Sequence, residues 1–172
     1  MDLNVKVGVR CRPLSSKEIE RGCSCIVSMT DKTVQIKKTD DELSQKDFTF
    51  DHCYFTDSTQ DAVYRDLGFP LLSQAMEGFN GTIFAYGQTG AGKSHSMTGT
   101  SSDKGIVPRL NDDLWRLTQE SLKTFRQSSD GATGDSQFMI TVTLTSFFFV
   151  IFLSMSDLFN GSAKGFLPRN IQ

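Results

Sequence analysis

The sequence has no excess of charge of either sign. Its 172 residues include 18 lysines and arginines against 20 aspartates and glutamates, which gives a formal net charge of −2. This balance favours neither nucleic acid nor an acidic membrane surface as a partner. At this length the chain can form one domain with a hydrophobic core of ordinary size.

Cysteine is scarce, and no apolar signal segment stands at the start of the chain. The four cysteines are Cys11, Cys23, Cys25 and Cys53. Without a signal segment, nothing indicates an oxidising compartment in which they would pair. Cys23 and Cys25 have no second Cys or His pair at metal-ligand spacing. We therefore expect reduced thiols, with neither disulfides nor a cysteine metal site.

The sequence does contain a glycine-rich loop between a predicted strand and a predicted helix. The apolar residues 82–86 lead into Gly87, and Gly92, Lys93 and Ser94 follow after four more residues. This is the phosphate-binding pattern G-x-x-x-x-G-K-[ST] in its strand–loop context. Glycines let backbone amides surround the phosphates, the lysine adds a positive charge, and the Ser94 hydroxyl is the expected Mg²⁺ ligand.

The sequence therefore predicts a site for a nucleoside triphosphate with Mg²⁺. The predicted phosphate-binding residues are Gly87, Gln88, Thr89, Gly90, Ala91, Gly92, Lys93 and Ser94.

The remaining pattern alternates strands with helices. Strands are predicted at 5–9, 26–29, 33–36, 48–50, 82–86 and 138–142, with loops at 37–47 and 127–135. One helix is predicted to begin after Ser58, with Asp61 completing its cap, and to be kinked at Pro70. Others are predicted to begin near Lys93 and at Pro108. This alternation indicates an α/β protein with a largely covered central sheet.

Five segments, taken in order, resemble the kinesin motor domain: residues 7–13, 48–51, 59–64, 78–94 and 105–109. The resemblance covers about residues 3–142. It implies a three-layer P-loop NTPase fold, with a central, mainly β sheet flanked by helices, truncated after roughly its first half. Ser94, together with the run from Arg12 to Glu18, favours the third, vesicle-transporting subfamily.

The resemblance also implies contacts to the nucleotide base of ATP or ADP. Arg10, Arg12 and Pro13 match the family's motif on one side of the base, and His95 matches the position on the other side. Taken alone, the two arginines would be a solvated strand end and His95 an exposed helix residue. The motif order favours the base-binding interpretation. Microtubules (tubulin) are the implied partner, and the cytoplasmic cytoskeleton is the implied location.

Two family elements needed for ATP hydrolysis do not occur in this sequence: Asn-x-x-Ser-Ser-Arg-Ser-His and Asp-Leu-Ala-Gly-Ser-Glu. We therefore assign no catalytic residue, and we do not expect the chain alone to hydrolyse ATP efficiently. Residues 1–142 are expected to be the N-terminal part of a motor domain. Residues 143–172 are expected to be a divergent apolar tail and not a domain.

Two other kinds of protein stay open. One is a different P-loop enzyme, such as a small-molecule kinase, although no cluster of basic residues follows Ser94 to form a lid. The other is a non-catalytic or membrane-anchored nucleotide-binding remnant, because residues 136–156 carry no charge. Threonines and serines dilute this run, and its first half matches a strand of the family, so we do not expect membrane insertion.

Overall fold

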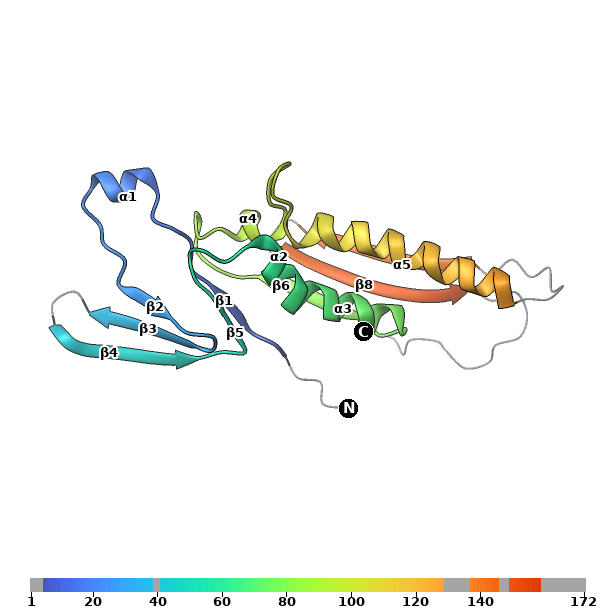
Figure 1. Ribbon diagram of the computed structural model, residues 1–172, viewed down its shortest axis with the longest axis horizontal. Helices are drawn as coiled ribbons and strands as arrows, with labels where there is room; N and C mark the ends of the chain where they lie inside the picture. Colours follow the sequence, from blue (N-terminus) through green and yellow to red (C-terminus); the bar gives the residue numbers. More distant parts are fainter. Residues whose placement is uncertain (1–4, 39–40, 129–136, 146–148, 159–172) are drawn as a thin grey trace.

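The computed structural model describes residues 5–38, 41–128, 137–145 and 149–158 (Figure 1). The helices are α1 (Ser16–Glu20), α2 (Gln60–Val63), the π-helical turn η1 (Tyr64–Gly68), α3 (Phe69–Met76), α4 (Lys93–Met97) and α5 (Ile106–Ser128). The strands are β1 (Gly8–Arg10), β2 (Val27–Met29), β3 (Thr33–Lys38), β4 (Asp41–Thr49), β5 (His52–Tyr54), β6 (Gly81–Ala85), β7 (Gln137–Thr145) and β8 (Phe149–Leu158). The chain is a mixed α/β protein, as the sequence predicts.

The described strands lie in three sheets and not in the one central sheet that was expected. Strands β1 and β5 form a parallel pair, β2, β3 and β4 form an antiparallel ribbon, and β8 lies between β6 and β7. In the described part of the chain no hydrogen-bonded ladder joins β1 to β6. Figure 1 shows the ribbon and α1 at one end of the molecule, away from β8 and α5.

The ribbon corrects one prediction. The β2–β3 hairpin forms as expected, closed by a 2.9 Å bond from the Thr30 amide to the Thr33 carbonyl. The loop predicted at 37–47 is wrong for residues 41–47, which belong to β4 and pair with β3. Lys46 and Asp47 are exposed, so a solvated ribbon accommodates the polar residues that suggested a loop.

The helical segment before the glycine-rich loop begins one residue later than predicted. Thr59, not Ser58, is the N-cap, and its hydroxyl accepts a 3.1 Å bond from the Ala62 amide. The Ser58 hydroxyl donates instead to the Phe55 carbonyl.

Just before Pro70, where the sequence predicts a kink, the structure has the π-helical turn η1. Proline has no amide hydrogen, so the carbonyl four residues earlier has no partner in a regular α-helix. The helix widens just before it, and the Phe69 amide donates to the Tyr64 carbonyl, five residues back.

The core lies where the α2–η1–α3 segment meets α4, α5 and β5. Its buried residues are Tyr54, Val63, Tyr64, Ala75, Met97, Ile106 and Leu110. The Tyr64 hydroxyl donates a 2.8 Å bond to Asp113 of α5. Burial, and then this bond, raise the pKa of Tyr64 above its ordinary value, so the hydroxyl stays a donor. The core thus fixes α5 against the segment that precedes the glycine-rich loop.

Strand β8 joins the tail to the strand that carries the glycine-rich loop. It pairs antiparallel with β6, with Ile151 opposite Ile83, and on its other edge with β7, with Ser154 opposite Thr141. The described residues of the uncharged run are therefore strands. Across the described ranges, no helix has both the length and the apolar character that a membrane crossing needs.

Candidate nucleotide-binding site

The glycine-rich loop runs from the end of β6 to the start of α4. Its backbone curls because Gly90 and Gly92 adopt φ values of 82° and 100°, a region that L-residues rarely occupy. Gly92 is the N-cap of α4, and its carbonyl accepts a 3.0 Å bond from the Ser96 amide. Within the loop, the Ala91 amide donates to the Gln88 carbonyl at 3.1 Å. Thr89 is exposed.

Lys93 folds back over this loop. Its ammonium group donates to the carbonyl oxygens of Gly87, at 2.7 Å, and Gln88, at 2.9 Å. The bonds hold a positive charge against the curled backbone before any ligand arrives. The arrangement suits an anionic group that would accept bonds from the same ammonium.

The residues present also fit a Mg²⁺ ion that travels with its nucleotide. Ser94 is exposed in the first turn of α4, next to Lys93. Within the described ranges, no group of three or more His, Cys, Asp or Glu side chains could hold a metal ion. Mg²⁺ commonly uses few protein ligands and takes the rest from phosphates and water. Bound there, the ion would neutralise phosphate charge.

Arg12 is fixed against the glycine-rich loop. Its Nε donates to the Gly90 carbonyl at 2.8 Å, and its two terminal nitrogens bind the Glu18 carboxylate at 2.8 and 2.7 Å. The hydrogen bond from Arg12, followed by those from Ser15, holds the pKa of Glu18 well below its usual range. Exposed Pro13 lies beside this group, and its carbonyl accepts a 2.9 Å bond from Arg12. The bond to Gly90 thus holds Arg12 at the loop, and the ion pair with Glu18 fixes its guanidinium.

Arg10 contacts α4 directly. Its guanidinium donates to the Gln60 side chain at 2.6 Å, to the Ser96 hydroxyl at 3.1 Å and to the Ser58 carbonyl at 3.1 Å. Burial lowers the pKa of Arg10 from its ordinary value. The guanidinium is therefore a partly buried group that links three segments, and not the solvated strand end considered above.

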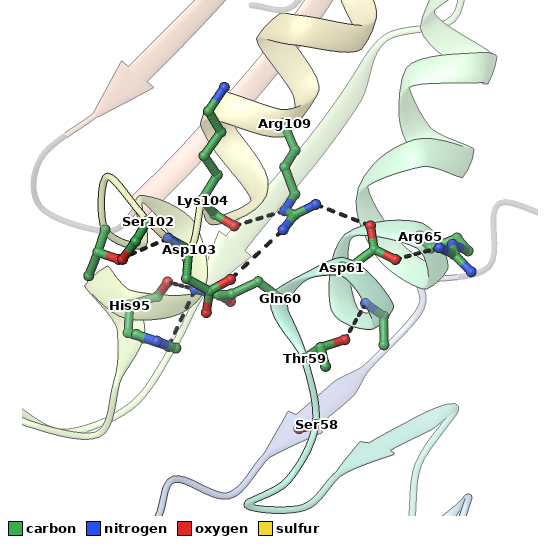
Figure 2. A network of polar contacts seen from close by, with 12 residues as sticks. Ser58, Thr59, Gln60, Asp61, Arg65, His95, Ser102, Asp103, Lys104 and Arg109 are labelled. Carbon is green, nitrogen blue, oxygen red and sulfur yellow. Dashed lines mark hydrogen bonds and ion pairs between the residues drawn. The ribbon is translucent and has the colours of Figure 1, made fainter.

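His95 and Arg10 are linked by Gln60, which is bonded to both. The Gln60 amide group donates to the His95 carbonyl at 2.5 Å and lies 3.4 Å from its ring Nδ1 (Figure 2). The structure thus brings all the predicted base and phosphate residues to the loop and α4, with Arg12 and Pro13 beside Gly90, and with Arg10 and His95 joined by Gln60.

A second polar network holds the start of α5 near α2. Arg109 binds Asp61 at 3.1 Å and donates to the Lys104 carbonyl at 2.8 Å, while Asp61 also binds Arg65 (Figure 2). Arg109 ends one of the segments that carry the resemblance. Its role in this structure is to hold together the elements around α4.

Sequence reasoning missed two residues that organise the site. Glu18 could have been found, because Ser15 and Glu18 have the S-x-x-E spacing of a capping box, which the structure contains. Gln60 could not have been found, because no local pattern marks a glutamine for burial.

The chain is similar in sequence to known proteins of one family. The family model described as the kinesin motor domain matches residues 10–169, so the similarity continues beyond residue 142. Kinesin-like protein KIF1C of Homo sapiens is 42% identical over an alignment of 131 residues, and the match covers 69% of this chain and 12% of that protein. Kinesin-related protein 1 of Dictyostelium discoideum is 40% identical over an alignment of 139 residues, and the match covers 69% of this chain and 6% of that protein.

Kinesin-like protein KIF1A of Rattus norvegicus is 42% identical over an alignment of 123 residues, and the match covers 65% of this chain and 7% of that protein. The chain thus spans a small part of the length of the curated relatives it matches. The two KIF1 proteins among them are consistent with the subfamily that the sequence favours.

Proposed function

Because the chain belongs to the kinesin motor domain family, we propose that it binds ATP or ADP with Mg²⁺ at the loop between β6 and α4. The observation that carries this proposal is the Lys93 ammonium, held 2.7 and 2.9 Å from two carbonyls of a loop curled at its glycines. Residues 87–94 would hold the phosphates. Ser94 would hold Mg²⁺.

The base is proposed to lie between the side of the site formed by Arg10, Arg12 and Pro13 and the side formed by His95. Two contacts support this assignment: Arg12 is bonded to Gly90 of the loop, and Arg10 is bonded to Ser96, the neighbour of His95. A base held there would be close to the phosphates. The nucleotide would then contact β1 and α4 together.

The test is a titration of the 172-residue chain with a fluorescent ATP analogue, with Mg²⁺ and again with excess EDTA. We expect saturable binding with Mg²⁺ and binding at least tenfold weaker with EDTA, because unshielded phosphate charges repel one another. Unlabelled ATP should displace the analogue. Absence of saturable binding in both buffers would refute the proposal.

If the gene encodes a longer protein, that protein is proposed to be a microtubule motor in the cytoplasm. Residues 143–172 are proposed to be a divergent apolar tail and not a domain. Strand β8 supports this, because it supplies a neighbour to the loop-bearing strand β6.

For this chain alone we predict no microtubule-stimulated ATP hydrolysis. The sequence holds neither of the two elements with which kinesins sense the γ-phosphate and place an aspartate near Mg²⁺. A phosphate-release assay with and without polymerised tubulin should give equal rates, while a full-length kinesin motor domain in the same assay should be stimulated. Stimulation of this chain would contradict the prediction.

A further inference from the structure

Gln60 is almost fully buried, which is unusual for a polar glutamine side chain. Its exposed fraction is 1%, and it is the one buried polar side chain among the residues whose side chains the structure describes. It stands at the first position of α2, directly after the N-cap Thr59. Burying an amide is unfavourable unless both of its ends are hydrogen-bonded.

Both ends of the Gln60 amide are used, and their partners fix its orientation. Arg10 can only donate, so the side-chain oxygen must face its guanidinium, at 2.6 Å. The His95 carbonyl can only accept, so the side-chain nitrogen must face it, at 2.5 Å. A carboxylate would meet the first need and fail the second, and an apolar side chain would fail both. The position therefore requires a group that donates at one end and accepts at the other.

The two partners of Gln60 lie on elements far apart in the sequence. Arg10 ends β1, and His95 is in α4, the helix that follows the glycine-rich loop. Arg10 is also bonded to the Ser96 hydroxyl and the Ser58 carbonyl, so the contact joins β1, α2 and α4. Figure 2 shows Gln60 reaching His95 from the start of α2. Gln60 thus forms a second link between the strand end and the helix, beside the direct bond from Arg10 to Ser96.

We propose that Gln60 is a positioning residue that holds Arg10 and His95 at the separation needed to grip a nucleotide base. The inference rests on the proposed function, since it assumes that these residues flank the base. Gln60 itself would touch no part of the ligand. It would control the part of the affinity that comes from the base and leave the part that comes from the phosphates unchanged.

The test compares the binding of ATP and of inorganic tripolyphosphate, both with Mg²⁺, to the wild type and to Gln60→Glu. Tripolyphosphate lacks the base and ribose, so it reports on the glycine-rich loop alone. We expect the ratio of ATP affinity to tripolyphosphate affinity to fall about tenfold in Gln60→Glu, because the His95 carbonyl would face a carboxylate. Tripolyphosphate affinity should stay within about twofold of the wild type.

Gln74→Glu is the matched control. It makes the same chemical change on an exposed position of α3 and should leave the ratio unchanged. If Gln60→Glu does not fold, as judged by circular dichroism, Gln60→Asn takes its place. That variant keeps the amide but is one methylene too short to reach both partners, so the same fall in ratio is expected.

The outcomes separate this inference from the proposed function. A general loss of structure would lower the affinities for ATP and tripolyphosphate in the same proportion. An unchanged ratio of the two affinities in the folded variant overturns the positioning role and leaves the proposed nucleotide site standing. A wild type that binds tripolyphosphate and ATP equally well also overturns it, because the base then contributes nothing. A wild type that binds neither ligand refutes the proposed function, and the inference with it.

Discussion

Lys93→Ala is expected to lower the affinity for Mg²⁺-ATP at least a hundredfold. In the wild type the ammonium is held 2.7 and 2.9 Å from the Gly87 and Gln88 carbonyls, so its charge stands at the curled backbone where phosphates would bind. Charge-assisted hydrogen bonds are the strong ones, and losing two or more of them is worth about 3 kcal/mol or more. Titration of both proteins with a fluorescent nucleotide measures the difference.

Two further variants make this result specific. Lys93→Arg keeps the charge but spreads it over a wider planar group, so we expect intermediate affinity. Lys6→Ala removes a surface lysine whose 3.1 Å ion pair with Asp51 lies outside the site, and it should bind as the wild type does. Equal affinity in the wild type and Lys93→Ala would remove the main support for a phosphate site.

Gly99→Ala is expected to destabilise the fold by more than about 3 kcal/mol. Gly99 has φ +72°, and an added Cβ would lie 2.3 Å from both the Asp103 carbonyl oxygen and the Gly105 nitrogen. These are backbone atoms of the loop between α4 and α5, tied by a 3.0 Å bond from the Gly105 amide to the Thr98 carbonyl. The loop cannot move aside without breaking that connection. Urea unfolding followed by circular dichroism gives the change in free energy.

Gly22→Ala is the matched control for this variant. Gly22 has the same φ of +72°, but nothing lies within 4 Å of the position that its Cβ would occupy. Only the backbone strain of a left-handed alanine remains, so we expect a loss of about 1 kcal/mol. The difference between the two variants measures the collision alone. If Gly99→Ala and Gly22→Ala lost the same free energy of unfolding, the predicted collision in the α4–α5 loop would be contradicted.

The local parts of this fold could be predicted from the sequence. The loop and the start of α4 follow from glycine spacing and the lysine, because those residues determine the backbone path without distant partners. The β2–β3 hairpin follows from a polar turn between two alternating runs. Pro70 indicated an irregular helix because proline removes a donor wherever it stands.

The parts that depend on distant partners could not be predicted. Strand β4 has too many polar residues to be recognised alone, and it forms because β3 offers a free edge to pair with. The burial of Gln60 depends on Arg10 and His95, which are 50 and 35 residues away. The separation of the strands into three sheets depends on which edges meet, and side-chain periodicity does not encode that.

The glycine-rich loop begins at the end of β6, which is an outer strand of its sheet in the described part of the chain. Its neighbour β8 pairs with all five of its residues, from Gly81 opposite Leu153 to Ala85 opposite Phe149. Coupling free energy between two sites is reciprocal. If pairing with β8 raises the affinity of the loop for its ligand, the bound ligand must stabilise the β6–β8 pairing by the same free energy. A variant with weaker pairing would then bind the ligand less tightly. Ligand affinity and the stability of the β6–β8 pairing would report the same coupling free energy.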